Sequence, residues 1–361
     1  MRAAMTDIAR LHLTTHPGLE DIVVAEFRER AAAAGLTEEA LSAEPAGFRG
    51  RVEVAAPLEE PELVALARSM RSIHHVLRPV LKLELEPGRE LAQLDAALRA
   101  AEIPELGPET SFRITPTRHG THDFTSMDMA RVAGAAVQAK TGAPVDLERF
   151  DVEIRVDLVE RDLAVAVQLT REPLSRRFAK PYEQRVSLKA DMAYAMLRLA
   201  GYPGPGAKLL DPFCGTGTIL LEAGEVWPGV IRVGSDFDPR AVEGAWRNLV
   251  ANRLEEGARI VRADARRLAE ELGEGGFARI VTNPPFGRVI GRGIHFFEFY
   301  LRMLASARRV LAPWGRMVVL AQRRDALRAA VEHHGHFRIV HARVVDMSRL
   351  FVGLFVLAPR E

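Results

Sequence analysis

The feature that most constrains the fold is a series of short apolar segments after residue 187, most of them ending at a turn that holds Gly, Asp or Pro. Helix-like stretches separate these segments, so the spacing predicts βαβ units and a doubly wound parallel sheet. Such sheets bind ligands at the carboxyl ends of their strands. The expected strands are 208–210, 230–235, 259–261, 279–282 and 316–320, and segments 338–345 and 354–357 predict a terminal antiparallel hairpin.

Composition excludes several classes of protein. The chain has 361 residues, of which 48% are hydrophobic and 27% charged, so we expect two or three globular domains rather than a disordered or fibrous chain. No apolar run approaches the roughly 20 residues that cross a bilayer, and we expect no membrane contact. Cys214 is the single cysteine, which excludes an internal disulfide and a cysteine-based zinc site. Nothing indicates export, so a cytoplasmic location is predicted.

Positive charge is concentrated in one stretch of a nearly neutral chain. The net charge is +1, yet residues 171–190 carry six Arg or Lys against two Glu. Such a stripe indicates that phosphates meet one surface, and a solvated linker is the alternative. The basic residues are 44 Arg and 5 Lys, and Arg is well suited to bidentate phosphate contacts.

Two small α+β units are expected ahead of the doubly wound sheet. Strands at 11–15 and 51–55, with a helix that Pro17 opens and another at 60–70, predict a first unit over residues 1–70. A second unit over residues 71–170 has strands at 80–85, 111–117, 152–158 and 163–169 and helices at 90–101 and 127–140. A basic linker, 171–186, leads to the last domain, 187–361.

The first strand of the doubly wound sheet ends in the string DPFCGTGT, residues 211–218. Its glycines allow a tight turn and close approach of a ligand, but the dinucleotide fingerprint would need glycine at Leu220, which disfavours an NAD oxidoreductase. The string resembles motif I of class I S-adenosylmethionine-dependent methyltransferases that act on exocyclic amino groups, and within it Cys214 is a packing residue. The resemblance implies cofactor contacts at Ser187, Lys189, Asp211, Pro212, Phe213, Gly215, Gly217 and Thr218.

Acidic residues follow the second and third strands. Asp236 directly follows its strand, where a carboxylate can accept two hydrogen bonds from ribose hydroxyls, and Phe237 lies beside it. Asp238 is the alternative, although it can instead cap the next helix. Asp264, followed by Ala265, resembles the family residue that recognises the adenine amino group, with helix capping as the alternative.

The fourth strand ends at NPPFG, residues 283–287. An exocyclic amine of guanine or adenine is a poor nucleophile, because its lone pair is delocalised into the ring. The carbonyls of the Asn283 side chain and the Pro284 main chain can accept its two N–H groups, and the prolines fix both acceptors. Phe286 offers a face on which a flipped base can stack. This segment predicts a metal-free, in-line methyl transfer, with Asn283 also beside the cofactor.

The N-terminal half resembles an RNA-binding module. After the strand at 111–114 the chain carries Arg118, His122 and Phe124 at alternating spacing, and residues 174–178 are LSRRF. This pattern resembles a THUMP domain with the ferredoxin-like domain that usually precedes it. The resemblance implies that this half holds the single-stranded 3′ end of tRNA. The residues expected to contact RNA are Arg118, His122, Arg176, Arg177, Lys180 and Arg288, although a packed role for His122 is equally open.

Over nearly its whole length the chain resembles THUMP-domain tRNA guanine-N2 methyltransferases, most closely those that modify position 6 of the acceptor stem. The partner would be the 3′ end and acceptor stem of tRNA, bound by a monomer. The alternatives are a guanine-N2 methyltransferase of large-subunit ribosomal RNA, a tRNA position-10 enzyme (typically Asp where this chain has Asn283), a DNA adenine-N6 methyltransferase and an inactive RNA-binding protein. No metal site is expected, because His333, His334 and His336 lack carboxylates at ligand spacing.

Overall fold

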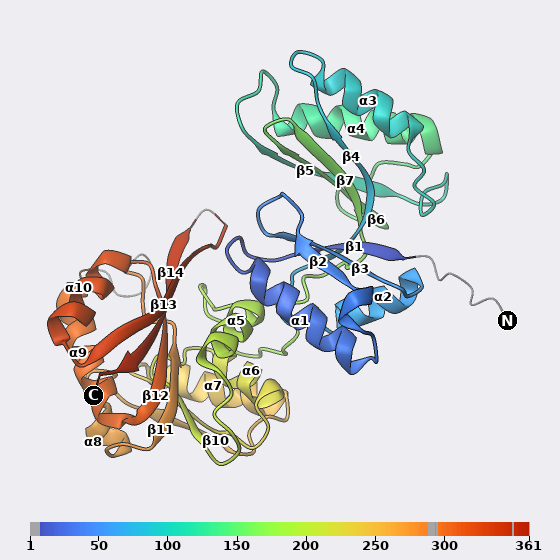
Figure 1. The fold of residues 1–361 in the computed structure, drawn as a ribbon. Coiled ribbons are helices and arrows are strands. Elements are labelled where there is room, and N and C mark those ends of the chain that lie inside the picture. Colours follow the sequence, from blue (N-terminus) through green and yellow to red (C-terminus); the bar gives the residue numbers. More distant parts are fainter. Residues whose placement is uncertain (1–7, 288–292, 294, 349, 361) are drawn as a thin grey trace. The chain divides into compact units, whose positions relative to one another are not determined.

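The computed structural model describes residues 8–287, 293, 295–348 and 350–360 (Figure 1). They form two compact units. The first holds the residues up to Thr15 together with Val23–Leu174, and the second holds His16–Ile22 together with the chain from Ser175 onward. Each unit contains a seven-stranded sheet. None of the helices in the described part of the chain is both long enough and apolar enough to cross a membrane.

The sheet of the first unit has the strand order β2-β3-β1-β4-β7-β6-β5, and all neighbours are antiparallel except β5 and β6. Helices α1 and α2 pack on its first half, and α3 and α4 on its second half. The elements are β1 (Ala9–Thr14), α1 (Glu20–Ala33), η1 (Glu38–Ala40), β2 (Ser42–Pro45), β3 (Arg51–Ala56), α2 (Glu60–Arg68), β4 (Val76–Glu84), α3 (Glu90–Ala100), β5 (Phe112–His119), α4 (Ser126–Thr141), β6 (Val152–Val159) and β7 (Asp162–Gln168).

Strand β4 joins the two halves of this sheet. Its first residues pair with β1, where Leu77 lies opposite His12, and the rest of the strand pairs with β7. The halves that the sequence analysis separates at residue 70 therefore share one sheet while keeping separate hydrophobic cores. The predicted strand starts too late, at residue 80, because Pro79 interrupts the pattern and the ladder shifts register between Pro79 and Leu81.

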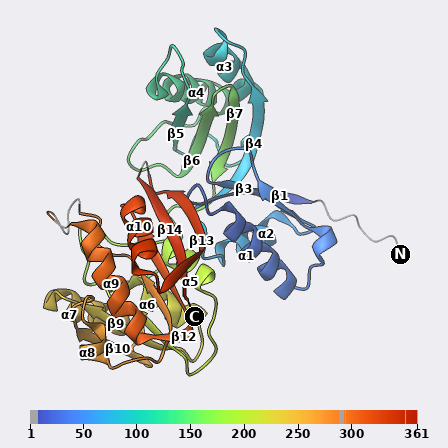
Figure 2. The ribbon, with the colours of Figure 1, turned by 60° about the vertical axis from the view of Figure 1, so that its left-hand side comes forward.

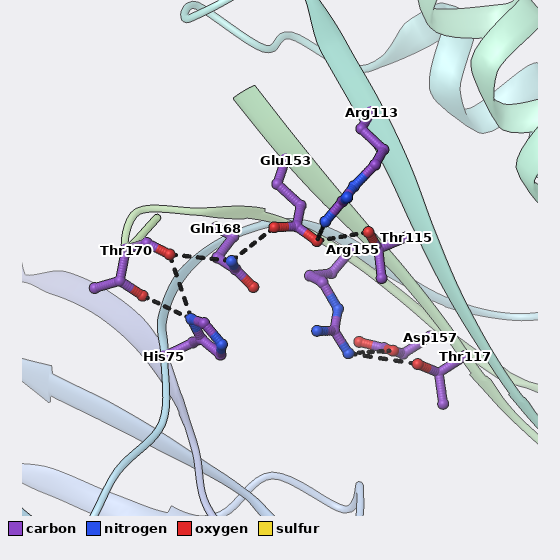
Figure 3. Close-up of polar contacts among 9 residues, drawn as sticks. All are labelled: His75, Arg113, Thr115, Thr117, Glu153, Arg155, Asp157, Gln168 and Thr170. Carbon is purple, nitrogen blue, oxygen red and sulfur yellow. Dashed lines mark hydrogen bonds and ion pairs between the residues drawn. The ribbon is translucent and has the colours of Figure 1, made fainter. Parts of the chain in front are cut away.

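A polar network covers the face of β5, β6 and β7 opposite to α3 and α4 (Figure 3). Glu153 is its centre. Its carboxylate accepts hydrogen bonds from Arg113 Nη2 at 2.8 Å, Thr115 Oγ1 at 2.6 Å and Gln168 Nε2 at 2.8 Å. Because strand side chains alternate between faces, these polar residues stand between the apolar ones that face the helices.

A buried ion pair between Arg51 and Asp157 ties β3 to β6, with side-chain exposures of 5% and 9%. We expect Arg51→Ala to lower the free energy of unfolding by about 3 kcal/mol, because the Asp157 carboxylate then keeps only the longer ion pair to Arg155, at 3.6 Å, among the described residues. Urea denaturation of the full chain measures this loss. The double variant Arg51→Met, Asp157→Leu should recover most of it, and a single variant as stable as the parent would contradict the role of the pair.

The second sheet has the order β10-β9-β8-β11-β12-β14-β13. The first five of these strands are parallel, and β14 is antiparallel to both β12 and β13. The doubly wound sheet with a terminal antiparallel hairpin is thus confirmed. Its strands are β8 (Lys208–Asp211), β9 (Ile231–Asp236), β10 (Ala258–Arg262), β11 (Phe277–Thr282), β12 (Leu311–Ala321), β13 (Phe337–Asp346) and β14 (Phe351–Pro359).

Helices cover both faces of the second sheet (Figures 1 and 2). One core packs α5 (Ala190–Ala200), α6 (Thr218–Val226) and α7 (Pro239–Ala251) against the strands, and the other packs α8 (Leu268–Leu272), α9 (Phe296–Val310) and α10 (Arg324–His334). The chain leaves β8 toward β9 on one side, and β11 lies on the other side of β8. This reversal is the point where such sheets form a ligand crevice.

Residues His16–Ile22 pack on the terminal hairpin of the second unit. The Asp346 N–H donates to the Pro17 carbonyl at 3.0 Å, and Arg343 forms an ion pair with Asp21. At Gly18, whose φ is +98°, a Cβ would lie 2.4 Å from the Val344 carbonyl oxygen, so this close approach requires glycine. The helix predicted to open at Pro17 accordingly begins only at Glu20.

Candidate active site

A cavity of about 1260 Å³ lies at the carboxyl ends of the central strands of the second sheet. Most predicted site residues meet there, since the turns after β8, β9, β10 and β11 all reach this edge. Lys189 and Gly217 are exceptions. They directly precede α5 and α6, and they are not among the described residues that line the cavity. The predicted residues that do line it are Ser187, Asp211, Pro212, Phe213, Gly215, Thr218, Asp236, Phe237, Asp264, Ala265, Asn283, Pro284 and Phe286.

Asp211 ends β8 and is buried. Its carboxylate accepts hydrogen bonds from Thr282 Oγ1 at 2.9 Å and from the Phe213 N–H at 3.2 Å. Burial, with a smaller contribution from the nearby Asp236, raises the pKa of Asp211 to about 7 against the opposing effect of these two donors. A cation that binds beside this buried carboxyl would stabilise its ionised form, so Asp211 suits the amino end of a cationic cofactor.

Asp236 is held by backbone donors on two sides. Its Oδ2 accepts from the Gly215 N–H at 3.1 Å, and its Oδ1 accepts from the Asp238 N–H at 3.0 Å. Burial raises its pKa. Asp238 itself caps α7 by accepting from the Arg240 N–H at 3.0 Å, so the capping role belongs to Asp238 and leaves Asp236 for the ligand.

Asp264 makes a local turn rather than a helix cap. Its Oδ1 accepts from the Arg266 N–H at 2.9 Å, and its Oδ2 accepts from Arg266 Nη2 at 2.6 Å. The hydrogen bonds from the Arg266 side chain lower the pKa of Asp264, so the carboxylate stays ionised. It lines the cavity in this paired form.

The loop after β11 holds an acceptor without a donor. The Asn283 Oδ1 is buried and has no hydrogen-bond partner among the described residues, while Pro284 is buried beside it. An unsatisfied buried carbonyl costs free energy that a bound N–H group can recover. Phe286 is half-buried and packs on the core beneath the loop. This arrangement is what an amine-binding site requires.

The basic segment is divided between inward and outward side chains. Lys180 Nζ donates to Thr218 Oγ1 at 2.7 Å and to Ser187 Oγ at 3.3 Å, and burial lowers its pKa. Arg177 lies 3.8 Å from the fully buried Glu222. These contacts argue against phosphate binding by Lys180 and Arg177, because both cations point into the protein. Arg176 is exposed, and Arg288 lies outside the described residues.

Hydrogen bonds between the Asn248 side chain and the main chain fix the basic segment to α7. Asn248 is fully buried, donates to the carbonyls of Tyr182 and Thr216, and accepts from the Tyr182 N–H. Gly244 allows this packing, since a Cβ there would lie 2.1 Å from the Tyr182 ring. The part of the predicted linker around Tyr182 is therefore built into the wall of the cavity.

In the first unit, the predicted RNA residues gather around Phe124. The ring of His122 lies 5.2 Å from that of Phe124, and the Arg118 guanidinium lies 5.9 Å from the same ring. His122 Nε2 also contacts the His119 carbonyl at 3.2 Å. A cation and two half-buried rings on one surface can contact phosphates and stack on bases.

Cys214 behaves as a packing residue. Its side chain is buried in the core behind the cavity, and burial raises the pKa of the thiol well above its ordinary value. A protonated, buried thiol is a poor nucleophile.

Sequence reasoning missed one wall of the cavity. His295, Glu298, Phe299 and Arg302, at the start of α9, line it together with Gln184 and Arg185. The α9 residues are spaced i, i+3, i+4 and i+7, which places them on one helix face. A search for polar residues at helical spacing after NPPF would have found them.

The fold and the motifs at its strand ends define a class I methyltransferase. Residues 177–352 match the RMKL-like methyltransferase domain family, and residues 89–168 match the THUMP domain family. The structure of TrmN from Thermus thermophilus superimposes with a TM-score of 0.79 at 36% identity, covering 98% of this chain and 100% of that one. A putative methyltransferase solved with SAH, SMU.472, shares the fold at a TM-score of 0.75 and 19% identity, over 98% of this chain and 99% of that one.

Two relatives with an assigned activity match this chain over nearly its whole length. A tRNA (guanine(6)-N2)-methyltransferase of Thermus thermophilus is 37% identical over 96% of this chain and 98% of its own length. An Archaeoglobus fulgidus protein of the same name is 28% identical over 97% of this chain and 92% of its own length. The chain belongs to the family of THUMP-domain methyltransferases that these proteins represent.

Proposed function

We propose that the protein transfers a methyl group from S-adenosyl-L-methionine to the exocyclic N2 of the guanosine at position 6 of the tRNA acceptor stem. The product is N2-methylguanosine. The observation that carries this proposal is the buried, unsatisfied Asn283 Oδ1 at the edge of a cavity shared with Asp211 and Asp236. The full-length likeness to the Thermus thermophilus enzyme supports the substrate.

The residues present fit the cofactor. The Asp211 carboxyl suits the amino group and the Asp236 carboxylate suits the ribose hydroxyls. Gly215, at a φ of +51°, lines the cavity and donates its N–H to Asp236. When bound, S-adenosyl-L-methionine supplies an electrophilic methyl group on a sulfonium.

The chain's own residues prepare the amine. Asn283 Oδ1 and the Pro284 carbonyl accept the two N2–H groups of the guanine, and this favours a nitrogen whose lone pair points toward the cofactor. Phe286 stacks on the flipped base. The N–C bond would form as the S–C bond of the sulfonium methyl breaks, and the amine would release one proton to water while Asn283 Oδ1 accepts a hydrogen bond from the nitrogen. The rate enhancement comes mainly from orientation and from acceptors that are fixed in advance.

Residues of both units would contact RNA. In the first unit the cluster of Arg118, His122 and Phe124 would contact the single-stranded 3′ end. In the second unit Arg176 would contact the acceptor stem. One tRNA needs one such grip and one pocket, so we propose a monomer. We further propose that it works in the cytoplasm, where tRNA is modified.

Methyl transfer to different nucleic acids tests this function. Purified protein with radiolabelled S-adenosyl-L-methionine should label unmodified tRNA transcripts and leave large-subunit ribosomal RNA and duplex DNA unlabelled. Label confined to ribosomal RNA would favour the ribosomal alternative. Absence of label in every nucleic acid would favour an inactive RNA-binding protein.

Cofactor binding should depend on the ionisation of Asp211. Because its pKa is raised to about 7, the carboxyl is protonated below that pH and its attraction for the cationic cofactor is lost. We expect the Kd measured by calorimetry to rise by about tenfold per pH unit below pH 6.5 and to level off above about pH 7.5. Asp211→Asn should bind more weakly with a flatter profile, and equal pH profiles for the two proteins would exclude Asp211 as the titrating group.

A further inference from the structure

One face of α9 forms a wall of the cavity. Glu298, Phe299 and Arg302 line the cavity, and the opposite face of the helix carries Tyr300 and Met303 in the hydrophobic core. The Phe299 ring lies 5.7 Å from the ring of Phe213 in the loop after β8. This contact fixes the helix face beside the motif that receives the cofactor.

Glu298 and Arg302 lie on this wall, and neither has a partner in the part of the chain that the structure describes. They are four residues apart, a spacing at which opposite charges commonly pair on a helix. Nevertheless, within the described ranges neither side chain makes an ion pair or a hydrogen bond, and both are exposed. By contrast, Asp264 of the same cavity pairs with Arg266 at 2.6 Å. The two α9 charges are therefore available to a ligand.

The NPPF loop alone does not distinguish guanine from adenine, because it holds an exocyclic amine and both bases have one. The neighbouring atoms differ. Beside its amine, guanine carries the N1–H donor, and O6 and N7 follow as acceptors on the same side of the base. Adenine carries an N1 acceptor beside its amine. A carboxylate next to the amine site therefore attracts guanine and repels adenine.

We propose that Glu298 and Arg302 read the guanine base, with the Glu298 carboxylate accepting N1–H and the Arg302 guanidinium donating to O6 and N7. In chain order, Asn283, Glu298 and Arg302 would then meet N2, N1 and the O6/N7 pair of the base in turn. The two α9 residues are about 6 Å apart along the helix axis. This inference rests on the proposed function and names the residues that set its base specificity.

A base analogue tests the role of Glu298. 2-Aminopurine at the target position keeps the N2 amine and lacks both N1–H and O6. The parent protein should prefer guanine in kcat/KM by roughly 10- to 100-fold. Glu298→Gln should narrow this preference to about threefold, since a carboxamide can accept from guanine N1–H or donate to N1 of the analogue. Glu332→Gln, on the exposed side of α10, is the matched control and should retain the parent's preference.

7-Deazaguanine tests Arg302 independently, because it removes only N7. The parent should lose roughly tenfold in kcat/KM on this base, and Arg302→Gln should show little further loss. Unchanged cofactor affinity of each variant reports that the site is folded. A Glu298→Gln protein that keeps the parent's preference would overturn the inference while leaving the methyltransferase function standing. A parent that methylates no guanine would instead overturn the proposed function, and the inference with it.

Discussion

Asn283→Ala is expected to lower kcat for methyl transfer by about 100- to 1000-fold, the range found when a fixed electrostatic contact to a transition state is removed. The Asn283 Oδ1 is buried and has no partner among the described residues, so its hydrogen bond to the amine is made only when substrate is bound. The cofactor Kd should change by no more than about threefold. Single-turnover kinetics and calorimetry measure the two quantities separately.

Asn283→Asp is the matched control for this variant. Its carboxylate keeps an acceptor at the same place, so it should retain more activity than the alanine variant. If Asn283→Ala methylated tRNA at the parent's rate, the acceptor role of the NPPF loop would be wrong. Loss of cofactor binding in parallel with activity would instead assign Asn283 to the cofactor site alone.

Asp236→Ala is expected to weaken cofactor binding by at least about 100-fold. The carboxylate would make charge-assisted hydrogen bonds to both ribose hydroxyls, and each such bond contributes about 1.5–3 kcal/mol. The variant also loses the bonds that hold the N–H groups of Gly215 and Asp238. Equilibrium dialysis with labelled cofactor gives the Kd directly.

Asp238→Ala provides the comparison for Asp236→Ala. Asp238 caps α7 through the Arg240 N–H, so its loss should cost about 1 kcal/mol of stability and leave the cofactor Kd within about twofold. A Kd that rises with Asp238→Ala and not with Asp236→Ala would reverse the assignment of the two acids.

The residues at strand ends were predictable because parallel strands bring their carboxyl ends to one edge of the sheet. Asp211, Asp236, Asp264 and Asn283 are far apart in the sequence and line one cavity. Each follows a short apolar run, and the topology alone gathers them. The same reasoning gave the doubly wound sheet and the terminal hairpin.

The direction of long basic side chains was not predictable from local sequence. Lys180 and Arg177 belong to a basic stretch that fits a phosphate-binding surface, yet they contact Thr218 and the buried Glu222. Inward orientation depends on partners about 40 residues away, and charge patterning carries no information on such partners. The pairing of β4 with both halves of its sheet was not predictable for a related reason. Pro79 interrupts the strand pattern, and the partner strands are distant in the sequence.

Mapping of the methylated nucleoside tests the central claim most directly. A tRNA transcript with guanosine at position 6 is treated with the protein and S-adenosyl-L-methionine, digested, and analysed by mass spectrometry, beside a transcript that carries inosine there. Inosine keeps the rest of the guanine base and lacks the N2 amine. We predict N2-methylguanosine at position 6 of the first transcript and no methylation of the second. Equal methylation of both transcripts would contradict transfer to N2 of that guanosine.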